Sequence, residues 1–408
     1  MKVANSPKVI VLLDQALFSG TSFLSTIIIA RMLDMETFGQ YSGYLLGIYL
    51  AVSGIGAFVI QPLQVLVGQI TNLKQYLTFA FWLQVLAVLV FVALIFVTTF
   101  IIQANFPFSA LVFAAGFLLH DFGRRVLLAL NRPKSTLLLD AISTLGLSAG
   151  LFFFYLDHQK DLSSLFGFVG IPYILSSLLL FWQIKPVYFE KAVLLTSFHL
   201  HVKEGKWLFL TAITQWWSSN LFVVASGIYL GAAALGALRL AQSLMGVLNV
   251  LLQAFENYIL PQTAIIINTD IHQGLAFLTD ASRKAGMLFL PVLAVTLIFS
   301  QQIFVLAGGK EYASYAYLLQ AITLLYVLVF ISQPIRLLIR ALRLNRHFFY
   351  GYLFSLTFAL VFSHSLLSNF GLTGVLIGLA ASQFLLIAYW VYILLNRNLQ
   401  LWKSFTSF

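Results

Sequence analysis

Six polar or small residues within one apolar run, roughly residues 235–267, share the spacing of a single helix face. They recur at steps of three and four residues, the period of one side of an α-helix. A guanidinium stays charged and presents a planar pair of donors that suits phosphate oxygens. Amides add neutral donors and acceptors beside it. The pattern predicts a helix face suited to a polar, anionic ligand, formed by Arg239, Gln242, Gly246, Asn249, Gln253 and Glu256.

Three carboxylates in apolar surroundings are candidates for binding a coupling cation: Asp14, Asp121 and Glu256. A carboxylate in a low-dielectric site can load and release a proton as its surroundings change. Asp121 precedes Arg124 and Arg125 by three and four residues, so an ion pair within one helix is the favoured interpretation there. For Asp14 we favour a bond to a neighbouring helix over a proton or sodium site, and both interpretations stay open.

Arginines near the ends of two apolar runs form a second set of candidate phosphate ligands: Arg124 and Arg125 in one run, Arg336 and Arg340 in the other. Topology explains the same charges without a ligand, because basic residues gather where membrane helices end. Arg239 likewise either contacts an anionic substrate or extends its side chain to the membrane surface. Among common catalytic patterns, no Gly-rich phosphate loop, HExxH or nucleophile elbow occurs, so no catalytic, metal or cofactor site is predicted.

The composition places these residues in a membrane protein. Hydrophobic residues make up 61% of the 408 residues and charged residues 9%, more apolar side chains than one water-soluble core can bury. A helix needs about 20 apolar residues to cross a bilayer, and β-barrel alternation does not recur. The sequence predicts an all-α integral membrane protein with about twelve spans, at roughly 9–30, 40–68, 76–102, 108–130, 136–156, 164–183, 207–230, 235–267, 286–306, 313–335, 348–368 and 372–395.

Positive charges alternate between the gaps that separate these runs. Of the 23 Lys and Arg residues, Arg31, Lys160 and Lys310 fall in one set of gaps, Arg239 lies within a run, and the rest fall in the other set. This is the positive-inside pattern of a multi-pass protein with both termini in the cytoplasm. The net charge of +10 therefore reflects topology and anionic lipid rather than nucleic-acid binding.

The two halves of the chain repeat each other. FGQY at 38–41 and LGAL at 235–238 each open a long helix that reaches a proline, and LNR follows the fourth and tenth spans at 130–132 and 344–346. Six spans per half return the chain to the same side, which gives parallel repeats related by an axis along the membrane normal. We predict an N-terminal lobe at 1–183, a cytoplasmic linker at 184–206 and a C-terminal lobe at 207–408.

The segment DQALFSGTSFLSTIIIARMLDMETFGQY, from Asp14 to Tyr41, resembles the opening of the polysaccharide flippases of the multidrug/oligosaccharidyl-lipid/polysaccharide exporter superfamily. The resemblance extends over the chain in span number, orientation, and helix starts and ends. It implies two six-helix lobes around a central cavity and alternating access. It also implies transport of undecaprenyl-pyrophosphate oligosaccharides to the outer face of the bacterial inner membrane, for O-antigen, capsule or exopolysaccharide synthesis.

The partners that follow are a lipid-linked oligosaccharide, membrane lipid, a polysaccharide polymerase, and H+ or Na+ as coupling ion. Two alternatives remain. A cation-coupled multidrug antiporter of the same superfamily is expected to have an apolar cavity with a carboxylate pair, and the arginines disfavour it. An integral-membrane enzyme acting on lipid-linked sugars would need a catalytic cluster or a large extramembrane loop, and the predicted outward loops are short.

Overall fold

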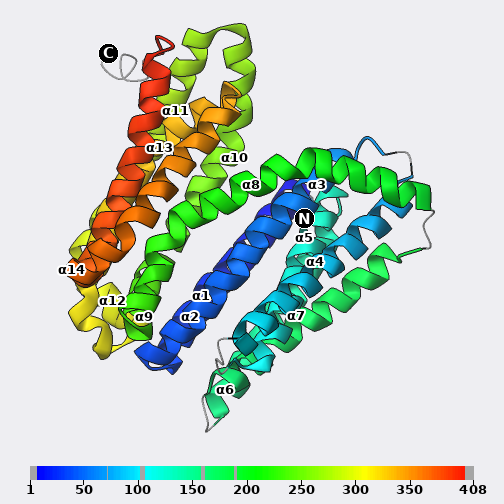
Figure 1. Cartoon of the computed structure of the whole chain (residues 1–408), viewed down its shortest axis with the longest axis horizontal. Helices are drawn as coiled ribbons and strands as arrows, with labels where there is room; N and C mark the ends of the chain where they lie inside the picture. The colour runs from blue at the N-terminus through cyan, green and yellow to red at the C-terminus, as the bar shows by residue number, and fades with distance from the viewer. Residues whose placement is uncertain (1–6, 71, 102–105, 158–160, 188–190, 400–408) are drawn as a thin grey trace. The chain divides into compact units, whose positions relative to one another are not determined.

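The computed structural model describes residues 7–70, 72–101, 106–157, 161–187 and 191–399, and every regular element in these ranges is a helix (Figure 1). The termini and Lys160, which enter the predicted topology, lie outside the described residues. The elements are α1 (Pro7–Met32), α2 (Met35–Ile55), η2 (Gly56–Ile60), α3 (Gln61–Leu66), α4 (Leu73–Ile101), α5 (Phe108–Ala129), α6 (Pro133–Leu156), α7 (Leu162–Ile184), α8 (Lys191–Tyr229), α9 (Ala232–Leu244), α10 (Gly246–Thr269), α11 (Ile271–Ile298), α12 (Ser300–Gly308), η3 (Lys310–Tyr315), α13 (Ala316–Ala341) and α14 (Asn345–Leu395).

All twelve predicted spans coincide with helices, which confirms the all-α prediction. Within the described residues, ten helices are long and apolar enough to cross a membrane by length and composition. Two differences explain why twelve predicted spans correspond to ten such helices. α5 contains three charged residues, Asp121, Arg124 and Arg125, and α14 joins two spans across Gly371, whose backbone is not helical (φ 56°, ψ −135°). Glycine adopts this conformation without the steric cost that a side chain would add.

Several helices extend beyond the apolar runs that predicted them. α11 begins at Ile271, and Asp270 caps it by accepting hydrogen bonds from the backbone N–H groups of His272 and Gln273. α8 begins at Lys191, so most of the predicted linker 184–206 is helical rather than irregular. Hydropathy marks the part of a helix that lipid can cover, whereas capping and local propensity set where the helix ends.

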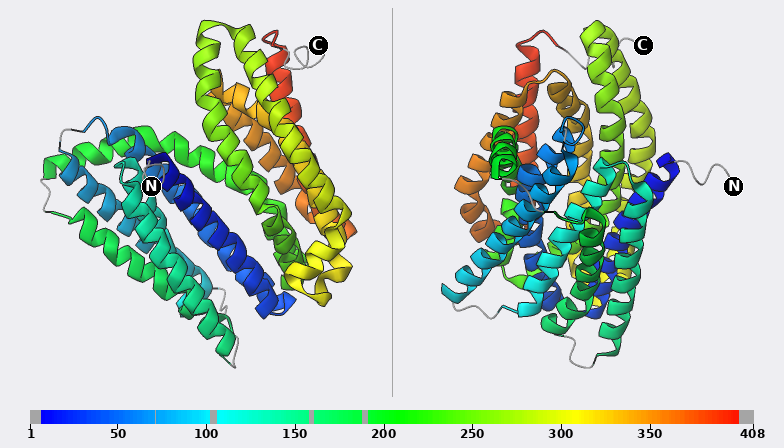
Figure 2. Two further views of the ribbon diagram at one scale, coloured as in Figure 1. Left: turned by 180° about the vertical axis from the view of Figure 1, so that it is seen from behind. Right: turned by 90° about the vertical axis from the view of Figure 1, so that its right-hand side faces the viewer.

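Contacts divide the chain into two compact units. Unit 1 comprises residues 1–25 and 44–213, and unit 2 comprises residues 26–43 and 214–408. In unit 1, α5 packs against α4, α6 and α7; in unit 2, α13 packs against α10, α11 and α14 (Figures 1 and 2). The chain passes from one unit to the other within α1, α2 and α8, because residues 26–43 pack with the second half of the chain.

The start of α2 joins unit 2 through glycine. The peptide backbones of α2 and α9 meet at Gly39 and Gly236, so closely that a Cβ on Gly236 would lie 2.5 Å from the carbonyl oxygen of Met35. A Cβ on Gly39 would overlap the carbonyl oxygen of Ala232. These glycines belong to the repeated FGQY and LGAL segments, so the repeat marks a helix crossing that only glycine permits.

The predicted LNR repeat is out of register by two residues. α5 ends before Asn131 (φ 55°) and α13 ends before Arg343 (φ 56°), each followed by a backbone hydrogen bond that closes the helix end. These bonds run from Arg132 N to the oxygen of Leu127 and from Leu344 N to the oxygen of Ile339. Asn131 therefore corresponds to Arg343 rather than to Asn345, because the left-handed residue that ends the helix defines the equivalence.

Candidate functional site

A closed charge network lies inside unit 1. The guanidinium of Arg124 on α5 donates from Nη2 to Asp14 Oδ2 of α1 at 2.8 Å and from Nε to Asp140 Oδ2 of α6 at 2.6 Å. Both carboxylates are 1% exposed and the arginine side chain is 9% exposed. The guanidinium also lies 4.3 Å from the centre of the Phe18 ring. One cation thus holds two carboxylates away from water, an arrangement that persists only because each charge is paired.

His120 extends this network. Its Nδ1 lies 2.8 Å from Ser176 Oγ and its Nε2 lies 3.1 Å from Asp140 Oδ1. Because Ser176 donates its own proton to the carbonyl of Tyr173, it accepts from His120 Nδ1. Nε2 and Asp140 Oδ1 form no hydrogen bond within the described residues, and they become an ion pair when the ring carries a second proton. The cluster formed by Asp14, Asp140, Arg124 and His120 is electrically neutral once it holds that proton.

Several sequence predictions concern this unit. Asp14 bonds a neighbouring helix, the favoured of its two interpretations. Asp121 pairs with Arg125 at 3.0 Å, which confirms the ion pair expected within one helix, whereas Arg124 binds Asp14 of α1 and Asp140 of α6. Asp140, which sequence reasoning missed, is a carboxylate inside an apolar span, the same signal that singled out Asp14.

A second charge cluster lies in unit 2. Arg336 and Arg340, one helical turn apart on α13, both donate to the carboxylate of Glu256 on α10. Arg336 also donates to Gln333 Oε1 at 2.8 Å. Two guanidiniums share one carboxylate, so the cluster keeps an excess positive charge while its side chains stay partly exposed. The sequence singled out these three residues separately, and the structure brings them together.

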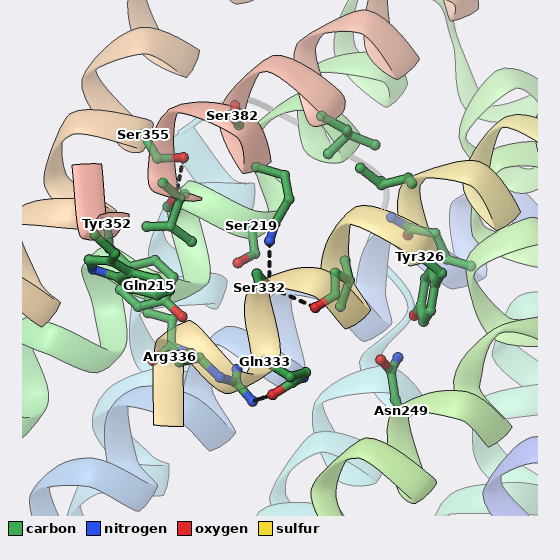
Figure 3. A pocket seen from close by; sticks show the side chains of 18 residues that line it. Gln215, Ser219, Asn249, Tyr326, Ser332, Gln333, Arg336, Tyr352, Ser355 and Ser382 are labelled. Carbon is green, nitrogen blue, oxygen red and sulfur yellow. Dashed lines mark hydrogen bonds between the residues drawn. The ribbon is translucent and has the colours of Figure 1, made fainter. Parts of the chain in front are cut away.

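A polar cavity of about 270 Å³ opens beside this cluster (Figure 3). Residues of α8, α9, α10, α13 and α14 line it, and Arg336 is the charged residue among them in the described part of the chain. Most of the polar lining consists of neutral amides and hydroxyls: Gln215, Ser218, Ser219, Gln242, Asn249, Tyr326, Ser332, Gln333, Tyr352, Ser355, Ser382 and Gln383. The cavity is therefore rich in hydrogen-bonding groups and carries positive rather than negative charge.

Bonds among the lining residues hold much of this surface in place. Ser218 donates to Ser355 at 2.8 Å, joining α8 to α14. Gln383 donates to Ser332 at 2.9 Å, joining α14 to α13. Tyr326 and Tyr352 lie on opposite sides of the cavity in Figure 3. Such cross-helix bonds fix the positions of the donors and acceptors before any ligand arrives.

The predicted polar stripe reaches this cavity only in part. Gln242 and Asn249 line it, whereas Arg239 and Gln253 are not among the lining residues. Arg239 donates to Gln242 Oε1 at 3.0 Å. The predicted continuous helix is interrupted at Met245, where α9 ends and α10 begins. The adjacent Gly246 weakens the helix there, so a strict helical projection does not hold across the break.

Sequence comparison identifies no relative, because neither a family model nor a curated protein matches the chain. Solved structures do match. The lipid II flippase MurJ in an inward closed conformation has a TM-score of 0.72 and 14% identity, over 98% of this chain and 88% of that chain. An inward-facing multidrug resistance MATE transporter of the MOP superfamily has a TM-score of 0.70 and 12% identity, over 96% of each chain.

A MATE transporter of Vibrio cholerae has a TM-score of 0.62 and 15% identity, over 97% of this chain and 96% of that chain. At these identities the similarity shows the fold. The chain is a multi-pass membrane protein with the all-helical fold of the MOP superfamily transporters, which have two six-helix lobes.

Proposed function

We propose that the protein is a transporter that moves a lipid-linked oligosaccharide across the cytoplasmic membrane of a bacterium, from the inner to the outer face, with both termini in the cytoplasm. The observation that carries this proposal is the unit 2 cavity, whose described lining residues combine neutral amides and hydroxyls with an arginine and include no carboxylate. Arginine suits the pyrophosphate and the neutral groups suit sugars. The similarity to a lipid II flippase supports the same class of cargo.

Arg336 and Arg340 are the proposed phosphate ligands. Glu256 holds both guanidiniums in place without cancelling their combined charge, and an incoming phosphate can take over donors that the carboxylate shares. Gln242 and Asn249 contribute neutral bonds. Arg124 takes no direct part in binding, because its donors are committed to Asp14 and Asp140. Among the sequence candidates, Arg239, Gln253 and Arg125 belong neither to the cavity lining nor to the Glu256 cluster, and they remain secondary.

The test is transport in proteoliposomes that contain the purified full-length chain and a fluorescent polyprenyl-pyrophosphate disaccharide. A membrane-impermeant lectin measures the sugar that reaches the far leaflet. Arg336→Ala should lower the rate about tenfold or more, since a charge-assisted bond contributes roughly 1.5–3 kcal/mol. Arg346→Ala, an exposed arginine, is the matched control and should leave the rate unchanged. Wild-type vesicles that flip no glycolipid under any gradient contradict the proposal.

One observation favours the alternative of a cation-coupled multidrug antiporter, namely the buried carboxylates of unit 1. We assign this network to energy coupling, with H+ as the ion, because a proton on His120 Nε2 would turn its 3.1 Å contact with Asp140 into an ion pair. Glycolipid and an organic cation such as tetraphenylphosphonium, offered to the same vesicles, distinguish the two functions. Transport of the cation without transport of the glycolipid selects the antiporter.

A further inference from the structure

Ser382 stands apart from the other buried serines of the unit 2 cavity. Its side chain on α14 is 5% exposed and its Oγ makes no hydrogen bond within the described residues, although it lines the cavity. The neighbouring serines are satisfied: Ser218 donates to Ser355, and Ser332 donates to the carbonyl of Val329 while it accepts from Gln383. A buried hydroxyl without a partner is destabilising. The position of Ser382 therefore indicates that a bound ligand supplies the missing hydrogen-bond partner.

The cavity has the size of a small ligand. Its volume of about 270 Å³ is just below the roughly 300–1,000 Å³ of pockets that hold drug-sized molecules. One six-membered ring with its substituents suits this space, whereas a chain of several rings must extend out of it. Figure 3 shows Ser382 and Arg336 at opposite ends, with Tyr352 and Tyr326 on the two flanks. A ring held between them meets polar groups around its rim.

The lining selects the chemistry of that ring. Amides and hydroxyls supply both donors and acceptors, which matches the hydroxyl groups of a sugar. An organic cation finds no carboxylate among the lining residues, and it meets the charge of Arg336. Tyrosine rings provide apolar faces for the C–H side of a sugar. Tyr326 lines the cavity together with Asn249, and Tyr352 lines it together with Arg336, so each ring lies in the same cavity wall as a polar side chain.

We propose that the cavity is a subsite for a single neutral sugar residue, in which Ser382 donates to or accepts from a sugar hydroxyl. This inference rests on the proposed transport of a glycolipid for the identity of the molecule that carries the sugar. Arg336 belongs both to the cavity lining and to the Glu256 cluster. The sugar that occupies the subsite is therefore the one next to the phosphate, and the subsite makes transport selective for that residue.

The absence of cysteine from the sequence allows a direct binding test. Ser382→Cys introduces a single thiol of nearly the same size into the cavity, and a small water-soluble methanethiosulfonate reagent reports its accessibility in the detergent-solubilised protein. Methyl glycosides of glucose, galactose and N-acetylglucosamine are the probes. At least one of them should slow labelling severalfold, and tetraphenylphosphonium should not. Ser363→Cys, also buried on α14 but outside the cavity lining, is the matched control and should show no protection.

Transport assays on Ser382 variants distinguish the sugar subsite from the proposed function. Ser382→Ala should fold like the wild type, because the hydroxyl makes no hydrogen bond to the described residues, and should weaken the apparent affinity for the glycolipid about tenfold. Ser382→Leu should block transport by filling the cavity. If wild-type vesicles flip the glycolipid and both variants flip it equally well, the subsite is wrong and the proposed function stands. If no glycolipid moves but methyl glycosides still protect the Ser382→Cys thiol, the sugar site stands and the proposed function is wrong.

Discussion

Arg124 and Arg336 occupy the same position in the two halves of the chain. Each lies seven residues before the left-handed residue that ends its helix, Asn131 in one case and Arg343 in the other. Arg124 is enclosed by two carboxylates, whereas Arg336 shares one carboxylate with Arg340 and faces a cavity. The two halves thus share the arginine but differ in its surroundings. In the first half the arginine is enclosed by carboxylates, and in the second half it faces a cavity.

The two halves also differ at the position that Asp140 occupies in the first half. Asp140 and Tyr352 each lie nine residues after the left-handed residue, on α6 and α14. Asp140 binds Arg124 through its carboxylate, whereas Tyr352 lines the cavity together with Arg336. A tyrosine adds no negative charge at this position, so Arg336 and Arg340 have Glu256 as their shared carboxylate. The excess positive charge of this cluster is the physical basis for the proposed phosphate ligands, whereas Arg124 is paired with two carboxylates.

The first prediction contrasts these two arginines. Arg124→Ala leaves Asp14 and Asp140 buried without their cation, which should lower the free energy of unfolding by about 3–5 kcal/mol. Arg336→Ala leaves Glu256 paired with Arg340, so its cost should be much smaller. Thermal unfolding of the detergent-solubilised variants, followed by size-exclusion chromatography, measures the difference. Equal melting temperatures would show that the unit 1 network contributes little to stability.

The second prediction concerns the proton in unit 1. His120→Gln removes the ring that completes the contact with Asp140, so transport should lose its dependence on a pH gradient while substrate binding persists. His364 of unit 2, whose ring packs against that of Tyr229, provides the control His364→Gln. Transport rates with and without an imposed pH gradient distinguish them. A His120→Gln variant with normal gradient dependence excludes this histidine from coupling.

The third prediction tests the glycine crossing of α2 and α9. Gly39→Ala forces a methyl group into the backbone of Ala232 and should destabilise the protein by several kcal/mol, since packed backbones cannot relax easily. Gly47→Ala, two turns further along α2, meets nothing within 4 Å and should stabilise the helix by about 0.5–1 kcal/mol. The melting temperatures should move in opposite directions, and a shift in the same direction would contradict the close contact.

The fourth prediction uses Asp34, which lies between α1 and α2. Its carboxylate accepts hydrogen bonds from the backbone N–H groups of Glu36 and Thr37 and from the hydroxyl of Thr37, and the bonds from Thr37 contribute most to holding its pKa below its ordinary value. A lowered pKa stabilises the fold above the unfolded value of about 3.9, and this stabilisation is lost as pH falls through the folded pKa. Asp34→Ala should cost about 0.5–2 kcal/mol near neutral pH and less below pH ~3. A melting-temperature difference that does not narrow with acidification contradicts this role.

The sequence predicted the helices well because lipid imposes a simple rule. Each span must be apolar for about 20 residues, and this pattern is visible without any knowledge of packing. The helix ends were harder to predict. Asn131 and Arg343 both adopt left-handed backbone, but the shared sequence LNR paired Asn131 with Asn345 instead. Arginine is an unusual residue at such a position, so the sequence offered no direct sign of the correct register.

The candidate site was predictable residue by residue but not as an arrangement. Glu256 and Arg336 are 80 positions apart in the chain, and their contact depends on how α10 packs against α13. Ser382 and Ser355 look like ordinary small residues of membrane helices, which commonly pack against neighbours. What distinguishes Ser382 is that its hydroxyl has no hydrogen-bond partner among the described residues. Hydrogen-bond partners depend on tertiary packing, so the sequence alone does not single out this serine.

The last prediction decides how far the polar stripe of α9 and α10 reaches. The sequence puts Gln242, Asn249 and Gln253 on one face, whereas the structure puts only the first two on the cavity. Single cysteines at Gln242 and Asn249 should therefore react with a water-soluble thiol reagent and be protected by the methyl glycoside that protects position 382. A cysteine at Leu240, which is fully buried, should not react. Gln253→Cys should show no protection by the sugar, because Gln253 lies outside the cavity lining, one turn further along α10 than Asn249. Protection at Gln253 equal to that at Asn249 would restore the continuous helix face and extend the sugar site along α10.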